Sequence, residues 1–128
     1  MTDKEYRLQK KRTQKYIDKW FTAMGLGWFK IDFMWERERD ATTPATIAKT
    51  TSAWQYRHGT IQWFLPACQQ ASDEELESSV IHEFVHVLIN PLCVVGESGD
   101  LDLQHEYATE TITRAFEWVR LAGQKDKL

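Results

Sequence analysis

The sequence predicts an α+β domain whose strands are grouped between helices, and three observations lead to this fold class. The first stretch of the chain is rich in Lys, Gln, Arg and Glu, which favour helix. The middle stretch contains β-branched residues and alternates apolar with polar side chains, which is typical of strands. The second half repeats apolar residues at helical spacing. The expected order is therefore one helix, the three strands of a mostly antiparallel sheet, and two further helices.

Length and composition are those of one globular domain spanning residues 1–128. Hydrophobic residues make up 42% of the chain and its net charge is -3, which excludes a disordered protein. Because no excess of positive charge is available to neutralise phosphates, we do not expect nucleic acid as a partner. The basic cluster at Lys10, Lys11, Arg12 and Lys15 is interpreted as a solvated helix face, with a weak contact to nucleic acid or an anionic surface as the alternative.

Cysteine usage and the N-terminus both indicate a cytoplasmic protein. Cys68 and Cys93 are too few for a disulfide scaffold, and free thiols in a reducing compartment are the simpler interpretation. Residues 1–16 contain neither an apolar segment nor a cleavage site of small residues, so no secretory signal is recognised. The apolar runs are only a few residues long, so no membrane span is expected.

The first helix is expected over residues 3–23, followed by Gly25 and Gly27 as stop signals. Residues 28–36 then alternate in places between apolar and polar side chains, which predicts a strand with one buried face. The apolar stripe of the helix is expected to comprise Tyr6, Thr13, Tyr16, Ile17, Trp20, Phe21 and Met24.

Two more strands are expected over residues 46–56 and 60–66, because both stretches carry β-branched residues with period-two character. Residues 57–59 between them suit a hairpin turn. Pro66 is expected to end the second of these strands.

The second helix is expected to begin near Ser72, since Ser72 and Glu75 form the S-x-x-E pattern of a capping box. It should end near residues 90–91, where a proline follows an asparagine. A loop with two glycines separates it from a last helix, which begins near residues 100–102 and ends at Gly123.

The motif that carries chemistry is an H-E-x-x-H pattern on the second helix, formed by His82, Glu83 and His86. Residues four apart lie on one face of a helix, so both imidazoles can reach one metal ion. Glu83 stands beside them and can act as general base on a water bound to that ion. Because the pattern specifies so few positions, a histidine pair in a core or on a surface is the alternative interpretation.

A catalytic zinc site needs a third protein ligand and an open position for water. Glu106 and Glu110 are four residues apart, so one can ligate the metal while the other supports a ligand histidine. His105 is the alternative third ligand and would require the last helix to be rotated by about 100°. A solvated helix face is the plain alternative for the two glutamates. The full set of candidates beyond the motif is Glu97, Asp100, Asp102, His105, Glu106 and Glu110.

With these residues identified, the sequence resembles the gluzincins, the thermolysin-type zinc metallopeptidases. In that family a glutamate beyond the second histidine is the third ligand, and an acidic residue one turn later supports a histidine. The resemblance implies a zincin-like fold and a zinc ion held by His82, His86 and Glu106. Glu110 would then support a histidine, where the family usually has Asp. The resemblance covers residues 46–120, and in size the chain is similar to minimal gluzincins, which include small phage-encoded or prophage-encoded proteins.

The resemblance implies hydrolysis of peptide bonds in a peptide or protein substrate. Zinc would lower the pKa of its water toward about 7. Glu83 would take the proton and return it to the leaving amine. His58, Tyr107 and Arg114 are candidates by residue type for stabilising the oxyanion, although a structural or solvent-exposed role is more common for such residues.

The strand before the active-site helix is expected to bind substrate, since in zincins an edge strand pairs with an extended peptide. The resemblance assigns this role to Thr60, Ile61, Gln62, Trp63 and Phe64. An ordinary sheet edge is the alternative.

Two alternative functions fit the same residues. One is a zinc-binding, catalytically weak or inactive module of a phage or mobile element, whose tryptophan-rich surface would bind a host or virion protein. The other is a zinc-free structural protein of such an element. A tryptophan-rich surface is the less favoured interpretation, because most of these residues are expected in the core. They are Trp28, Trp35, Trp54, Trp63 and Trp118.

Overall fold

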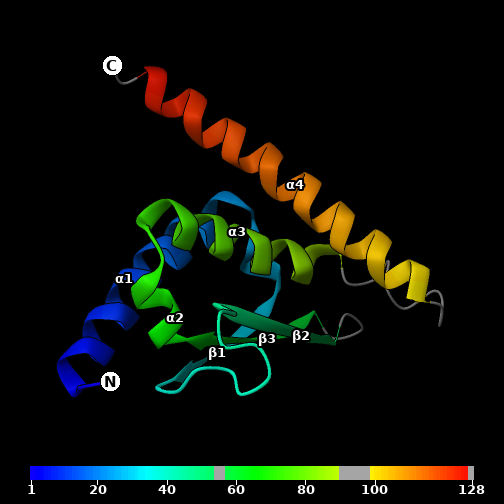
Figure 1. Cartoon of the computed structure of the whole chain (residues 1–128). Coiled ribbons are helices and arrows are strands. Elements are labelled where there is room, and N and C mark those ends of the chain that lie inside the picture. The colour runs from blue at the N-terminus through cyan, green and yellow to red at the C-terminus, as the bar shows by residue number, and fades with distance from the viewer. Residues whose placement is uncertain (54–56, 90–98, 127–128) are drawn as a thin grey trace.

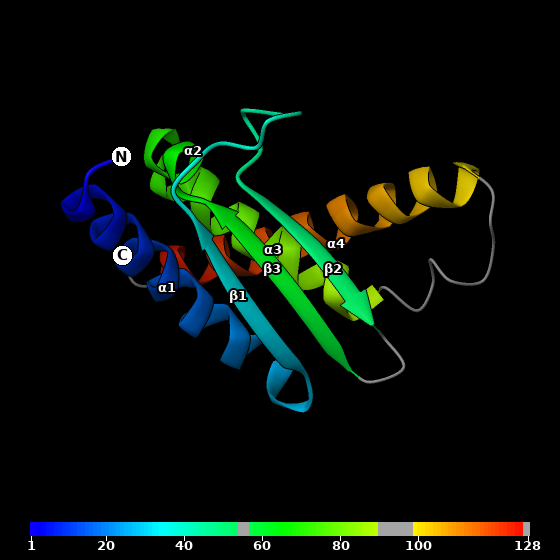
Figure 2. The same cartoon turned by 90° about the horizontal axis from the view of Figure 1, so that it is seen from below.

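The computed structural model describes residues 1–53, 57–89 and 99–126, and for residues 53, 99–105 and 124–126 it describes the backbone alone. A three-stranded sheet lies on one side of the molecule and helices cover one of its faces (Figure 1, Figure 2). The predicted α+β class is confirmed. The described elements are α1 (Asp3–Ala23), the 3-10 helix η1 (Leu26–Trp28), β1 (Lys30–Glu36), β2 (Ala48–Ala53), β3 (His58–Phe64), α2 (Leu65–Gln70), α3 (Asp73–Ile89) and α4 (Gly99–Asp126).

The sheet is mixed rather than mostly antiparallel, which corrects the prediction. Its strand order is β1-β3-β2, with β3 parallel to β1 and antiparallel to β2. The segment 37–47 connects β1 to β2 across the position of β3, the central strand. β2 therefore lies at the edge of the sheet opposite to β1. Of the strands that follow one another in the sequence, only β2 and β3 are therefore neighbours in the sheet. The parallel pair, β1 and β3, joins strands that are not consecutive.

Several predicted boundaries differ from the structure for local reasons. His58 and Gly59, expected in a turn, belong to β3, which is paired on both sides over this length. Pro66 lies in the first turn of α2, where its missing N–H removes no helical hydrogen bond. Gly123 lies within α4 rather than after it. The predicted helix end and most of the predicted loop fall on residues 90–98, outside the described residues.

Alternate residues of the strands face the helices and form the core. On β3, Gly59, Ile61 and Trp63 are buried, while the residues between them remain partly exposed. Gly59 permits a close approach of α3, because a Cβ atom there would lie 3.2 Å from Cγ2 of Val87. The helix that carries the H-E-x-x-H motif is thus packed directly onto the sheet.

The tryptophans predicted for the core are divided between core and surface. Trp63 is fully buried and Trp35 packs partly buried against the core, as expected. Trp28 and Trp118 are 73% and 74% exposed, so the prediction was wrong for both. Trp28 belongs to η1, the short turn between α1 and the sheet. Trp118 lies on α4, which packs mainly against α3. Trp54 lies outside the described residues.

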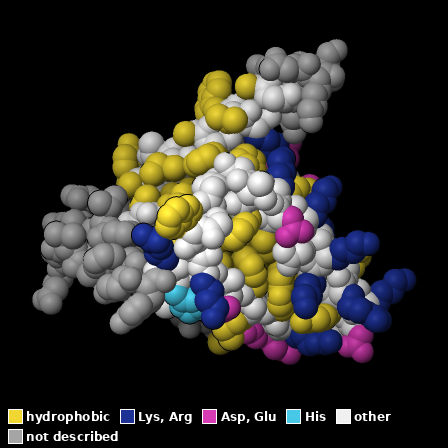
Figure 3. Space-filling view, turned by 180° about the vertical axis from the view of Figure 1, so that it is seen from behind, with side chains coloured by type: hydrophobic (Ala, Val, Ile, Leu, Met, Phe, Trp, Pro, Cys, Tyr) yellow, Lys and Arg dark blue, Asp and Glu magenta, His cyan; other side chains and the backbone are white. Residues whose placement is uncertain are grey.

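One member of the predicted solvated basic face has a structural role. The three lysines of the cluster are exposed, and Lys and Arg side chains form a band over the α1 side of the molecule in Figure 3. Arg12 instead donates hydrogen bonds to the carboxylate of Asp73 at 2.8 Å and to the carbonyls of Cys68 and Ala71 at 2.8 and 2.7 Å. It therefore joins α1 to the end of α2 and to the beginning of α3.

Three smaller predictions are answered by the described residues. The Ser72 hydroxyl accepts a hydrogen bond from the N–H of Glu75 at 3.1 Å, as a helix cap should. Cys68 is a buried free thiol, and Cys93 lies outside the described residues. Among the described helices, none combines the length and the apolar composition that crossing a bilayer would require.

Replacement of Arg12 by Met is expected to lower the free energy of unfolding by about 2 kcal/mol, because charged hydrogen bonds between three helices are lost. Urea denaturation followed by circular dichroism measures this change. Lys11→Met, at an exposed neighbouring position, is the matched control and should alter stability by less than about 0.5 kcal/mol. Equal stability of the two variants would contradict the structural role of Arg12.

Candidate metal centre

The two histidines of the motif lie on one face of α3 and point toward α4. They are partly buried, with 26% and 17% of the side chains of His82 and His86 exposed. Their Nε2 atoms face each other at 3.1 Å, which follows from their spacing of four residues on a helix. The rest of the helix is held in the core by the buried apolar side chains of Leu76, Val80, Ile81, Phe84, Val85 and Val87.

Glu106 of α4 completes a cluster with the two histidines. Its carboxylate oxygens lie 3.2 Å from Nε2 of His86 and 3.9 Å from Nε2 of His82. One ligand atom from each of the three residues lies within 4.8 Å of the other two. Ligand atoms bonded to a tetrahedral zinc ion at about 2.0–2.1 Å are roughly 3.3 Å apart. The separations of His86 from His82 and from Glu106 are close to this value, at 3.1 and 3.2 Å, while that of His82 from Glu106 is longer, at 3.9 Å. Two imidazoles with one carboxylate are a donor set that zinc accepts.

Glu110 lies one turn further along α4 and contacts the back of a histidine. Its Oε2 atom is 3.3 Å from Nδ1 of His82, whose Nε2 faces the cluster. A carboxylate at this position holds the imidazole in the tautomer that leaves Nε2 free to ligate. Arg114 in turn lies 3.4 Å from Glu110. The structure thus brings His82, His86, Glu106 and Glu110 together.

Glu83 is buried beside the cluster without a cation as its partner among the described residues. Its residue exposure is 7%, and the Thr50 hydroxyl of β2 donates a hydrogen bond to its Oε2 atom. Burial raises the pKa of the Glu83 carboxyl to about 7; the hydrogen bond from Thr50 opposes this rise and the negative charge of Glu106 adds to it. A carboxyl group with this pKa can accept and return a proton near neutral pH.

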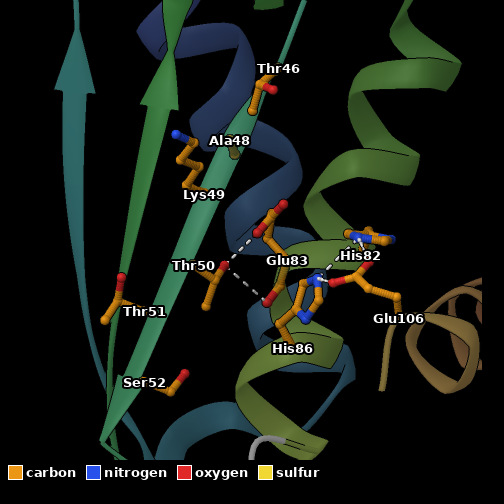
Figure 4. Close-up of a pocket in the computed structure, with 10 residues that line it drawn as sticks. All are labelled: Thr46, Ala48, Lys49, Thr50, Thr51, Ser52, His82, Glu83, His86 and Glu106. Atoms are coloured by element: carbon orange, nitrogen blue, oxygen red, sulfur yellow. Dashed lines mark hydrogen bonds and ion pairs between the residues drawn. The ribbon is translucent and has the colours of Figure 1, made fainter. Parts of the chain in front are cut away.

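These residues line a cavity of about 600 Å³ (Figure 4). One wall is formed by β2 and by Thr46, which precedes this strand. The other wall is α3, and Glu106 reaches in from α4. The lining consists of Thr46, Ala48, Lys49, Thr50, Thr51, Ser52, His82, Glu83, His86 and Glu106.

The strand at this cavity is β2, and the predicted substrate strand is elsewhere. Thr60, Ile61, Gln62, Trp63 and Phe64 all lie in β3, which is hydrogen-bonded to β1 on one side and to β2 on the other. β3 therefore has no open edge within the described sheet, and its prediction as an edge strand was wrong. The parallel pairing of β1 with β3 is the cause, because it places β3 in the centre and β2 at the edge.

The predicted oxyanion-stabilising residues do not line the cavity. His58 pairs with Asp32 at 2.8 Å. It precedes Gly59, which faces α3, so His58 lies on the opposite face of the sheet. Tyr107 is 77% exposed, and Arg114 contacts Glu110. The remaining third-ligand candidates, Glu97, Asp100, Asp102 and His105, lie outside the residues whose side chains are described.

The sequence-based prediction missed two polar residues, one beside the cluster and one further along the same helix. Thr50 was part of a predicted strand, but its contact with Glu83 depends on which strand packs against the helix. Glu77 is 5% exposed and lies on the same helix as the motif. Its position between the buried residues Leu76 and Val80 was a usable signal, because a carboxylate on the buried side of a helix requires partners.

Comparison of this chain with protein-family models, with curated proteins and with solved structures found no match. The functional interpretation therefore depends on the geometry and chemistry of the residues themselves.

Glu83 predicts a pH-dependent difference in stability between the metal-free wild type and Glu83→Gln. The pKa of Glu83 is raised from 4.5 to about 7 in the folded chain, so the folded state holds the proton more tightly than the unfolded state. Stability from this group is complete below the unfolded pKa and is lost as the pH rises through the folded pKa. From about pH 5 to pH 8 the wild type should lose roughly 2.5 kcal/mol relative to the variant. Urea titrations with chelator at each pH measure the difference, and a constant difference would contradict the prediction.

Proposed function

We propose that this chain is a zinc-dependent metallopeptidase in which Glu83 is the general base. The observation that carries the proposal is that His82, His86 and Glu106 converge on the cavity that also contains the buried carboxyl of Glu83. A purely structural metal site has no use for this extra carboxyl group, whose burial without a cation costs free energy. A hydrolase uses it to move protons.

The residues fit a zinc ion with an accessible position. His82, His86 and Glu106 would hold the ion, and Glu110 would orient His82 through Nδ1. Because only three protein groups would hold the ion, a water molecule could also bind to it. When bound, zinc supplies Lewis acidity toward this water and toward the carbonyl group of the substrate.

Glu83 moves the proton in the proposed reaction. It takes a proton from the attacking water and returns it to the nitrogen of the leaving amine. Thr50 occupies Oε2 of the carboxylate, so Oε1 is the oxygen proposed to exchange the proton. The hydrogen bond also links the orientation of the base to β2, the strand along which we place the substrate.

The substrate is proposed to pair with the open edge of β2. The N–H of Phe64 on β3 donates to the carbonyl of Ile47, directly opposite, at 2.9 Å. In an antiparallel ladder, hydrogen-bonded and non-hydrogen-bonded pairs alternate. Residues at even positions of β2, including Thr50 and Ser52, therefore direct their N–H and C=O groups toward the open edge. An extended peptide bound there would run along the cavity that contains the base.

The test of the proposed function combines metal analysis with peptide hydrolysis. Wild-type protein is expected to contain one equivalent of zinc and to cleave unstructured peptides, with loss of activity in chelator and recovery on adding zinc. Glu83→Gln should retain the metal and lose at least about 100-fold in kcat, because the proton acceptor is removed. Glu74→Gln, the same substitution at an exposed position of α3, is the control and should leave both properties unchanged.

Each other result has a defined meaning. Protein that binds zinc but cleaves no peptide in a broad library would support a metal-binding interaction module instead. Protein that retains no zinc after purification and reconstitution would contradict the metal site. Equal activity of Glu83→Gln and wild type would exclude Glu83 as the base.

The edge-strand proposal predicts that Ser52→Pro raises KM by about fivefold, the equivalent of one backbone hydrogen bond worth about 1 kcal/mol. Proline removes an N–H that faces the open edge and leaves the ladder to β3 intact. Ser52→Ala retains this N–H and should leave KM unchanged; the Ser52 hydroxyl itself has no hydrogen-bond partner within the described residues. Steady-state kinetics on one peptide decides the matter, and an unchanged KM for Ser52→Pro would argue against β2.

A further inference from the structure

We infer that Arg120 positions the third metal ligand by holding α4 in register against α3. The inference rests on the proposed metal site, and it concerns a residue about four turns of helix away from Glu106. Arg120 is only 11% exposed at its side chain, although it is an arginine on a helix with a largely exposed outer face.

The two helices run antiparallel and are joined by polar pairs along their contact. As the residue number rises along α3, the number of the partner on α4 falls, and Figure 1 shows the two helices passing in opposite directions. The pairs are Glu77–Arg120 at 3.4 Å, His82–Glu110 at 3.3 Å and His86–Glu106 at 3.2 Å. The ion pair of Glu77 lies at one end of the contact and the metal cluster at the other.

Glu77 connects this ion pair to the body of the protein. Its Oε2 atom accepts hydrogen bonds from Nζ of Lys19 at 2.7 Å and from Nε1 of Trp20 at 3.0 Å, both on α1. Its Oε1 atom faces Nε of Arg120 at 3.4 Å. One buried carboxylate is therefore shared between α1 and α4. If Arg120 moved away, the buried carboxylate of Glu77 would lose one of its two cationic partners. The ion pair between Glu77 and Arg120 therefore resists sliding of α4.

Few apolar side chains of α4 reach the core. Ile112 and Phe116 pack against it partly buried, with the ring of Phe116 6.0 Å from that of Trp20. The fully buried side chains in the described part of α4 are Thr109 and Thr113, which are polar. A slide of α4 by one helical turn, about 5.4 Å, would carry Glu106 out of reach of the histidines. Directional polar pairs add specificity of register where few apolar side chains make the contact.

The experiment measures zinc affinity by competition with a chromogenic chelator in wild type, Arg120→Met and Arg114→Met. Arg120→Met is expected to weaken zinc binding about tenfold, as loss of an outer positioning contact does. Simple electrostatics predicts the opposite sign, because removing a cation favours binding of a divalent ion. Arg114→Met removes the same charge closer to the site, from a side chain that is 71% exposed, and should not weaken binding by more than about twofold.

A double-mutant cycle distinguishes positioning from general destabilisation. In a Glu106→Gln background, Arg120→Met should change zinc affinity less than in the wild-type background, because the ligand that it positions is absent. Lys19 still neutralises Glu77 in Arg120→Met. Should that variant nevertheless fail to fold by circular dichroism, Arg120→Gln replaces it in the same cycle, with the same direction of change expected.

The outcomes separate this inference from the proposed function. Wild-type protein that does not bind zinc overturns both. Wild-type protein that binds zinc, together with an Arg120 variant of equal affinity, overturns only the role of Arg120. Equal effects of Arg120→Met in the two backgrounds also overturn it. A tenfold loss that largely disappears in the Glu106→Gln background supports it.

Discussion

Two of the proposed metal ligands stand on α3 and the third stands on α4, so the site exists only while these helices remain paired in one register. The contact between them contains an ion pair at one end and histidine–carboxylate contacts at the other. Polar groups are directional and expensive to leave unpaired in a buried setting. This makes the pairing specific where apolar side chains would tolerate a shift.

The sheet contributes to the site through its edge. Because β3 occupies the centre, β2 lies beside the cavity with its outer backbone groups unpaired in the described sheet. Gly59 lets α3 approach the sheet, and Thr50 reaches from β2 to Glu83. The same strand thus bounds the cavity, bonds the proposed base and presents an edge to which an extended chain can add.

Two buried carboxylates on α3 have different surroundings, which separates the structural role of one from the chemical role proposed for the other. Glu77 and Glu83 are similarly buried, at 5% and 7% exposed. Glu77 has Lys19 and Arg120 as cationic partners, so its charge is balanced and it joins three helices. Glu83 has the neutral hydroxyl of Thr50, and its pKa is raised to about 7. A buried carboxyl group with a pKa near neutrality, facing a cavity, is a typical sign of a functional group.

The sequence by itself determined the features that depend on neighbours in the chain. The α+β class, the long helices and the common face of His82 and His86 follow from composition and from helical periodicity. The four-residue spacing of Glu106 and Glu110 likewise placed both on one side of a helix. Only the tertiary structure decided the strand order, the edge position of β2, the contact of Thr50 with Glu83 and the pairing of Glu77 with Arg120. Each of these joins segments far apart in the sequence, and no local periodicity records which faces of two distant elements will pack together.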